Sequence, residues 1–357
     1  MVQICHHCYI CPSPPLFSNV PKHRDIGNGD YLLTFVATVG DWKLCVSTYF
    51  QGLPPISFSV VRPGQNLGVF ALPGNGDGQL NDPSGCAFHA TDKQLYIADA
   101  ENHRVQVLTA PEGTFVQQFG KNAAVKLSLS TPFDVCLDSL DGLCYIADTW
   151  NHRIRVVRVS DGTLVLQWGS QGAGQGEFSF PSGILLWKGL VFVADQQNHR
   201  VQIFHHKDGR FLSQIGTGMR STEPGGLSLP WFMAAYEDHL YVVDHGNFRI
   251  SVFRMEDFQF TRAFGGRGSG RGEVGYVTGI CIDPRTGLAY IGDSSNFRVQ
   301  IFVASTGMYK GWFGGQGVEP GRFSGVRGIA VDSEASVLYV VDNKNNRVQT
   351  MACYRTS

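Results

Sequence analysis

One polar pattern, Asp-x-x-Asn-x-Arg, occurs six times in the chain and contains the residue types that could do chemistry. A carboxylate, an amide and a guanidinium at fixed spacing resemble a catalytic constellation. A set that recurs six times is seldom an active site, however, and Asp and Asn side chains commonly hydrogen-bond the backbone of tight turns. The arginine can pair with a turn acid or a carbonyl group while its stem covers apolar surface. We therefore interpret the pattern as structural; its copies are Asp99, Asn102 and Arg104; Asp148, Asn151 and Arg153; Asp195, Asn198 and Arg200; Asp244, Asn247 and Arg249; Asp293, Asn296 and Arg298; and Asp342, Asn345 and Arg347.

The residue between the asparagine and the arginine is histidine in the first three copies. In the other copies it is Phe248, Phe297 and Asn346. Because phenylalanine replaces histidine at this position, we expect a packing role there rather than a metal ligand.

The spacing of the pattern indicates a repeat architecture. Successive aspartates lie 47 to 49 residues apart, and a fixed period of this size is typical of repeat proteins. Within the second unit the sequence predicts four short strands, at 133–137, 144–147, 153–157 and 164–168, separated by turn residues. No segment shows a sustained helical period. Four short strands in each period predict an all-β fold, a six-bladed β-propeller with four-stranded antiparallel blades.

The sequence also predicts how the ring closes, because the last unit ends after its third strand. Phe70 precedes Asp99 by 29 residues, the same separation by which Phe119 precedes Asp148. No strands of a repeat come before Phe70. We therefore expect a strand at about residues 66–71 to complete the last blade, which would remove an open sheet edge.

The composition limits the function classes. The 357 residues carry a net charge of −1, which argues against a strongly basic nucleic-acid-binding protein but not against a local basic patch. No apolar run is long enough for a membrane helix, and the N-terminus lacks a signal-peptide pattern. Nine cysteines are scattered along the chain, and Cys86, Cys136 and Cys281 fall in apolar strand patterns. Unpaired core thiols favour a reducing compartment, the cytoplasm.

We divide the chain into an N-terminal extension, residues 1–65, and a propeller, residues 66–357. Proline and glycine predict irregular structure over residues 1–30. Three β-like runs, at 31–38, 42–50 and 56–61, could form a degenerate blade or a small appendage. The cluster of Cys5, Cys8 and Cys11 suggests zinc, but all its ligands lie within seven consecutive residues, without a distant second pair. We favour an incidental cluster.

The Asn-His-Arg triplets at 102–104, 151–153 and 198–200 resemble the NHL repeat, and the resemblance covers roughly residues 66–352. It implies a β-propeller that serves as a protein-interaction scaffold, for example the substrate-recruiting module of a ubiquitin-ligase-type assembly. It also implies an alternative, an RNA-binding domain. Extracellular sensors and a lyase acting on peptidyl-hydroxyglycine are built on similar propellers. No RING, B-box or coiled coil precedes the repeats, so a ligase activity does not carry over.

A propeller enzyme would place its chemistry at the channel mouth, where the first strand of each unit begins. A lyase-like zinc site would need several histidines there, and a lactonase-like calcium site several acidic and amide side chains. Only one residue at the mouth is acidic and none is histidine, so we expect no metal, no cofactor and no catalysis. The mouth residues in phase are Ser84, Phe133, Ser182, Trp231, Thr278 and Arg327, followed by Gly85, Asp134, Gly183, Phe232, Gly279 and Gly328.

The glycine-rich loops between units offer a binding face, because in a closed ring they all lie on one side. This face mixes cations with aromatic rings, which suits a protein partner through Trp and Arg anchors or RNA through phosphate contacts and stacking. Alternatively, the arginines are merely solvated. We expect a monomeric propeller that binds a protein, with RNA as the second candidate and an enzyme as the third. The candidate residues are Arg267, Arg271, Arg322, Arg327, Lys121, Lys126, Phe133, Asp134, Trp231 and Phe232.

Overall fold

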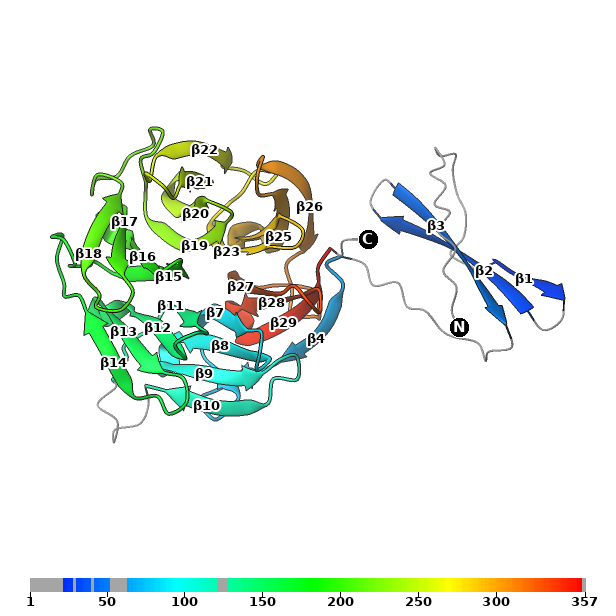
Figure 1. The fold of residues 1–357 in the computed structure, drawn as a ribbon, viewed down its shortest axis with the longest axis horizontal. Helices are drawn as coiled ribbons and strands as arrows, with labels where there is room; N and C mark the ends of the chain where they lie inside the picture. Colours follow the sequence, from blue (N-terminus) through cyan, green and yellow to red (C-terminus); the bar gives the residue numbers. More distant parts are fainter. Residues whose placement is uncertain (1–21, 28–29, 40–41, 52–62, 121–127, 355–357) are drawn as a thin grey trace. The chain divides into compact units, whose positions relative to one another are not determined.

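A computed structural model of the chain describes residues 22–27, 30–39, 42–51, 63–120 and 128–354 (Figure 1). The chain divides into two compact units, residues 1–62 and 63–357. Several residues singled out in the sequence lie outside the described part: Cys5, Cys8, Cys11, Lys121, Lys126 and the run at 56–61.

The first unit contains a three-stranded antiparallel sheet of its own, in the order β1 (Lys22–Gly27), β2 (Asp30–Val39) and β3 (Trp42–Gln51). Strands β2 and β3 match two of the three expected runs. The expectation of irregular structure over residues 1–30 is wrong for β1. Its sequence, KHRDIG, lacks the alternating apolar residues that indicate a strand. Pairing with the longer β2 therefore decides its conformation.

The second unit confirms the predicted fold, a ring of six four-stranded antiparallel blades (Figure 1). We letter the strands of each blade a to d from the ring's centre outward. Blade 1 contains β7 (Pro83–His89), β8 (Gln94–Asp99), β9 (Arg104–Thr109) and β10 (Phe115–Phe119). Blade 2 contains β11 (Asp134–Asp138), β12 (Leu143–Asp148), β13 (Arg153–Arg158) and β14 (Leu164–Trp168). Blade 3 contains β15 (Pro181–Trp187), β16 (Leu190–Asp195), β17 (Arg200–His205) and β18 (Phe211–Ile215). Blade 4 contains β19 (Pro230–Tyr236), β20 (His239–Asp244), β21 (Arg249–Arg254) and β22 (Phe260–Gly265). Blade 5 contains β23 (Val277–Asp283), β24 (Leu288–Asp293), β25 (Arg298–Val303) and β26 (Met308–Gly314). Blade 6 contains β27 (Val326–Asp332), β28 (Val337–Asp342), β29 (Arg347–Ala352) and β4 (Asn66–Phe70).

Two further kinds of short element complete this unit. A one-turn 3-10 helix joins strands b and c in every blade: η1 (Ala100–Asn102), η2 (Thr149–Asn151), η3 (Gln196–Asn198), η4 (His245–Asn247), η5 (Ser294–Asn296) and η6 (Asn343–Asn345). Before blade 1, β5 (Leu72–Pro73) pairs in parallel with β6 (Gln79–Leu80). Among the described residues, no helix has the length and apolar character needed to span a bilayer.

The burial of each strand follows from its place in the blade. Strands b are buried along almost their whole length, as in β12, because neighbouring blades cover both faces of the sheet. Strands d alternate between half-buried and exposed residues, as in β14, because one face looks outward. Apolar clusters fill the space between successive blades, and one of them joins Leu95 of blade 1 to Tyr339 of blade 6.

The predicted closure is confirmed by β4, which pairs antiparallel with β29. Phe70 lies opposite Val348, as Phe119 lies opposite Val105 in blade 1. Phe70 is 8% exposed and packs in the cluster that contains Tyr339. An N-terminal strand therefore completes the C-terminal blade.

The innermost strands form a closed ring in which each a strand contacts the a strands of both neighbouring blades. Glycine permits this approach. A Cβ atom on Gly279 would lie 1.9 Å from the carbonyl oxygen of Arg327 in the next blade, so no other residue fits without moving the backbone.

Candidate binding face

The aspartate of each repeat pattern joins its blade to the loop that enters it. In blade 1, Asp99 accepts hydrogen bonds from the backbone N–H of Asn81 at 2.7 Å and from the side chains of Asn102 at 2.9 Å and Arg104 at 2.7 Å. The guanidinium of Arg104 also donates to the carbonyl groups of Gly76 and Gln79, each at 2.8 Å. The aspartate–arginine pair recurs in all six blades. The pattern thus holds the entering loop, the b–c turn and strand c together.

The variable residue of the pattern makes contacts that the sequence did not predict. It adopts the left-handed conformation in every blade. The Nδ1 atoms of His103, His152 and His199 accept hydrogen bonds from backbone N–H groups of the next blade's entry loop, at 3.0, 3.2 and 3.1 Å. Asn346 does the same with its Oδ1 atom, at 2.7 Å. A role in packing alone is therefore wrong for these four blades, and only Phe248 and Phe297 lack the acceptor.

Antiparallel pairing gives the propeller two faces with different loops. The b–c turns and the d–a loops share one face, which we call the loop face, and the a–b and c–d turns share the opposite face. The six mouth residues lie on the loop face, where each a strand begins.

Bulky and small residues alternate around the mouth of the central channel. Blades 2, 4 and 6 supply Phe133, Trp231 and Arg327, whereas blades 1, 3 and 5 supply small hydroxyl residues. The ring of Phe133 packs edge-on against Trp231 at 5.4 Å, and the guanidinium of Arg327 lies 5.4 Å from the Phe133 ring. The hydroxyl of Ser182 donates to the carbonyl of Pro230 at 3.1 Å. The bulky residues thus cover the mouth.

A stack of aromatic rings continues from the mouth across the loop face. The rings of Trp231 and His245 lie 4.1 Å apart and nearly parallel, at 8°. The ring of Tyr276 lies 5.2 Å beyond His245, and that of Phe248 lies 5.9 Å beyond Tyr276. We call Phe133, Trp231, His245, Tyr276 and Phe248 the aromatic track.

The track is largely uncharged at neutral pH even though it contains a histidine. His245 Nδ1 lies 2.7 Å from the carbonyl oxygen of Val277, which can only accept, so Nδ1 carries the proton. Burial lowers the pKa of His245 below its usual value, despite that hydrogen bond. Tyr276 is 56% exposed and presents the largest accessible ring of the track.

The predicted cations of this face differ in how far they are neutralised. Arg327 Nη1 lies 2.9 Å from the carboxylate of Asp82, which also pairs with Lys344 at 3.0 Å. Burial disfavours the charged form of Asp82, but Arg327, Asn343 and Lys344 outweigh that cost and hold its pKa below the usual value. Arg327 is therefore already paired.

The other described arginines of the prediction are exposed on two d–a loops. Arg322 donates to the carbonyl of Gly314 at 3.0 Å. Arg267 lies over the ring of Phe248 at 5.0 Å and so extends the aromatic track. Arg271 lies four residues further along the same loop. Within the described residues, neither Arg267 nor Arg271 has a carboxylate at ion-pair distance.

Two predicted face residues lie beneath the surface, so the prediction that they belong to the binding face is wrong for them. Phe232 is 5% exposed and Asp134 is 6% exposed. Asp134 accepts a hydrogen bond from the backbone N–H of Ile184 in the next blade, at 3.0 Å. Burial raises the pKa of its carboxyl to about 8, although hydrogen bonds from Ile184 and Val135 favour the charged form.

We expect Asp134 to make the stability of the propeller depend on pH. Its ordinary pKa is 3.8 and its folded-state pKa is about 8. Between these values the folded chain holds a proton that the unfolded chain releases, so the free energy of unfolding falls as pH rises. The melting temperature should fall by at least about 2 °C between pH 5 and pH 8 relative to that of Asp134→Asn.

Thermal unfolding followed by circular dichroism at several pH values measures this difference. His199 and His245, whose pKa values are lowered chiefly by burial, contribute with the opposite sign, but equally in both proteins. If the melting temperatures of the wild type and Asp134→Asn change with pH in parallel, the prediction is contradicted.

A pocket of about 200 Å³ adjoins the track on the loop face, between blades 2 and 3. Its apolar walls are Phe133, Trp150 and Phe180, and the Trp150 and Phe180 rings meet edge-on at 5.8 Å. The floor contains the hydroxyls of Thr149 and Ser182, which already donate to carbonyl groups of neighbouring blades. Trp150 and Phe180 were not predicted from the sequence, because they lie outside the mouth positions.

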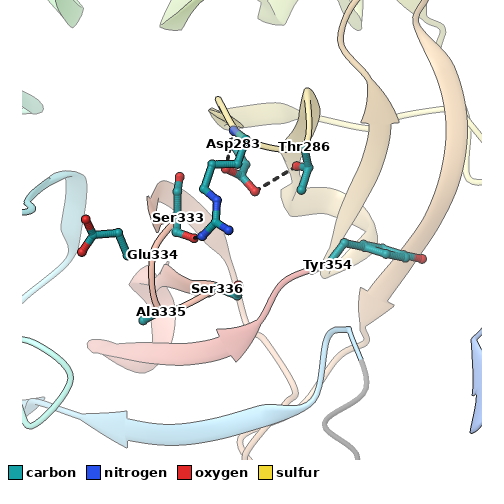
Figure 2. Close-up of a pocket in the computed structure, with 8 residues that line it drawn as sticks. Asp283, Thr286, Ser333, Glu334, Ala335, Ser336 and Tyr354 are labelled. Carbon is teal, nitrogen blue, oxygen red and sulfur yellow. Dashed lines mark hydrogen bonds between the residues drawn. The ribbon is translucent and has the colours of Figure 1, made fainter. Parts of the chain in front are cut away.

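The opposite face has a second pocket, of about 360 Å³, between blades 5 and 6 (Figure 2). Its polar groups largely satisfy one another. Thr286 donates to Asp283 at 2.9 Å, and Arg285 donates to the carbonyl of Ser333 at 2.7 Å. This pocket therefore offers a ligand few free groups.

A group of potential metal ligands, Asp138, Asp141 and His206, also lies on the opposite face, between blades 2 and 3. Asp138 accepts hydrogen bonds from the backbone N–H groups of Leu140 and Asp141, at 3.1 and 3.2 Å. This is ordinary turn chemistry, which explains the position of Asp138 without an ion.

The ring of six four-stranded antiparallel sheets defines the chain as a β-propeller. A sequence model of the NHL repeat matches residues 80–108 and 178–204, which lie in blades 1 and 3. The chain thus carries NHL repeats, as the sequence pattern predicted. No curated protein matches the chain.

Two solved structures illustrate how widely the fold occurs. Hydrazine synthase from Kuenenia stuttgartiensis has a TM-score of 0.55 and 11% identity, over 80% of this chain and 98% of that chain. A nidogen/laminin complex has a TM-score of 0.51 and 18% identity, over 70% of this chain and 84% of the matched chain. At these identities the likeness concerns the fold alone.

Proposed function

We propose that the chain is a non-catalytic scaffold whose loop face binds a protein partner. The observation that carries the proposal is the aromatic track, a continuous row of contacting rings that leads outward from the channel mouth and includes the exposed Tyr276. Aromatic residues and arginine dominate the energetics of protein interfaces. Blades packed tightly around a closed inner ring hold this surface rigid, which lowers the entropy cost of binding.

The charges of the loop face favour a protein over RNA. The six arginines of the repeat pattern are all paired with aspartates, and Arg327 and Lys344 are paired with Asp82. Nucleic-acid binding draws its affinity from many cations that are free to reach phosphates. Among the described residues, the exposed arginines of the d–a loops without a carboxylate at ion-pair distance are Arg220, Arg267, Arg271 and Arg322. They are fewer than the roughly six to ten phosphate contacts of a typical nucleic-acid-binding protein.

Catalysis is not part of the proposal. The described mouth residues include a single carboxylate, Asp134, and it is buried and bonded to the next blade. A general acid or base must reach the substrate's proton directly or through one water molecule. Asp134 has no such access beneath the mouth.

The free thiols support a reducing compartment for this interaction. Cys136, Cys144 and Cys281 are buried free thiols, and Cys86 is a partly buried free thiol. We propose a monomeric propeller that works in the cytoplasm. Recruitment of substrates to a ubiquitin-ligase-type assembly is a narrower role that the following experiment also addresses.

We expect the immobilised chain to capture proteins from a cytoplasmic extract, and Tyr276→Ala to reduce this capture about tenfold by removing an exposed interface ring. Quantitative mass spectrometry of the captured proteins, with and without nuclease, measures the effect. Ubiquitin-ligase components among them would support the narrower role.

Leu140→Ala is the matched control, because Leu140 is 97% exposed and lies on the opposite face. It should leave the capture unchanged. If nuclease abolishes the capture, or if salt weakens it steeply, the loop face binds RNA and the proposal is wrong.

A further inference from the structure

The pocket and the aromatic track form one continuous surface, because Phe133 belongs to both. Phe133 lines the pocket between blades 2 and 3, and its ring also contacts Trp231, the next ring of the track. The track then continues through blade 4 to the d–a loop before blade 5. A ligand that enters the pocket can therefore follow the rings outward across the face.

The pocket is sized for one apolar side chain. Its volume of about 200 Å³ is below the ~300–1,000 Å³ of typical small-molecule sites. Phe133, Trp150 and Phe180 form apolar walls, and the hydroxyls of its floor are occupied by carbonyl groups. Thr131, Gln196 and Gln197 also line the pocket, but its three aromatic walls favour an aliphatic or aromatic side chain over a charged one.

The far end of the surface is positively charged. Arg267 lies over Phe248, the last ring of the track, and Arg271 follows on the same exposed loop. The nearby carboxylate of Glu273 accepts a hydrogen bond from the backbone N–H of Gly270 at 2.9 Å and pairs with neither arginine. An arginine held against an aromatic ring is well oriented to bind an incoming carboxylate through two hydrogen bonds.

We propose that this surface binds an extended acidic peptide segment of a protein partner. One apolar side chain of the segment occupies the pocket, its chain lies along the aromatic track, and an aspartate or glutamate pairs with Arg267 and Arg271. Successive ring centroids lie 4.1–5.9 Å apart, so the surface accommodates at most about eight extended residues. The inference rests on the proposed function and specifies the partner's chemistry.

A phage-displayed library of random linear peptides, selected on the full chain, tests the proposal. The enriched peptides should contain an apolar residue followed or preceded, within about eight residues, by Asp or Glu. Fluorescence anisotropy of one such synthetic peptide then measures affinity. Trp150→Ala, Tyr276→Ala and Arg267→Glu should each weaken binding about tenfold or more. Leu140→Ala and Arg210→Glu, which change exposed residues of the opposite face, should not.

A charge exchange makes the test specific. A peptide whose acidic residue is replaced by lysine should lose affinity for the wild type and regain it for Arg267→Glu. Enrichment of peptides without acidic residues, or affinity unchanged by Trp150→Ala and Tyr276→Ala, overturns the proposal. Displacement of the peptide by oligouridine would show that RNA uses the same surface, and that outcome also overturns it.

The failures of the two proposals are distinguishable. If the library yields no peptide but Tyr276→Ala still reduces capture from the extract, the loop face binds a folded protein surface. In that case the proposal of a protein-binding scaffold holds, and the proposal of an acidic peptide ligand is wrong. If neither peptide nor protein depends on Tyr276, both proposals are wrong.

Discussion

Removal of residues 1–70 is expected to abolish the folded propeller, whereas removal of residues 1–62 is expected to leave it intact. The longer deletion takes away β4, the outer strand of blade 6. It exposes the edge of β29 and removes Phe70 from the cluster that joins blades 1 and 6. The shorter deletion ends where the compact second unit begins, at Pro63.

The longer deletion is expected to destabilise the propeller strongly, because it removes several stabilising contacts at once. Deleting a buried phenylalanine alone costs about 3–5 kcal/mol, and β4 also contributes its backbone pairing and the hydrogen bond from Asn66 to Gln349 at 2.9 Å. The total approaches the ~5–15 kcal/mol by which domains are stable. The open edge of β29 would in addition promote association between chains.

Size-exclusion chromatography with light scattering and thermal unfolding distinguish the two deletions. The shorter one should be a folded monomer with the melting temperature of the full chain, and the longer one should be aggregated or unfolded. A longer deletion that melts cooperatively, as a monomer, at the original temperature would show that closure by β4 is dispensable.

Asp99→Ala is expected to lower the free energy of unfolding by about 3–5 kcal/mol, because it leaves a buried guanidinium without its counter-charge. The side chain of Arg104 is 1% exposed and that of Asp99 is fully buried. The substitution also removes the acceptor for the backbone N–H of Asn81, so the loop that enters blade 1 loses one of its anchors.

The chain supplies a matched comparison in blade 4. Asp244 makes the equivalent pair, but the side chain of Arg249 is 18% exposed and can be hydrated when its partner is removed. Asp244→Ala should therefore lower the free energy of unfolding by about 1–2 kcal/mol less than Asp99→Ala does. Urea unfolding followed by fluorescence measures both values. Equal losses of unfolding free energy in the two variants would mean that burial of the arginine does not determine the size of the loss.

The repeat period carried most of the information about the fold. Because Asp-x-x-Asn-x-Arg recurs in phase with four strand signals, the number of blades, their strand order and the closing strand ending at Phe70 followed from spacing alone. Strand β1 did not, because its polar sequence carries no period and its conformation depends on pairing with β2.

The candidate site was predictable only in part. The sequence indicated that Phe133, Trp231 and Arg327 meet at the channel mouth, because they share one position of the repeat. It did not indicate that Arg327 is paired with Asp82 or that Asp134 lies beneath the surface. Those outcomes depend on contacts between blades that are far apart in the sequence.

The sequence by itself determined the ring, because a repeat unit of this kind buries its apolar faces only against copies of itself. The tertiary structure alone decided how the loop face is used. Ring stacking from Trp231 to Phe248, the pocket beside Trp150, and the placement of Arg267 over Phe248 arise where loops of successive blades meet. Several of these loops share a glycine framework, but the side chains that they carry differ from blade to blade, so the contacts of these side chains are fixed by packing rather than by the repeat.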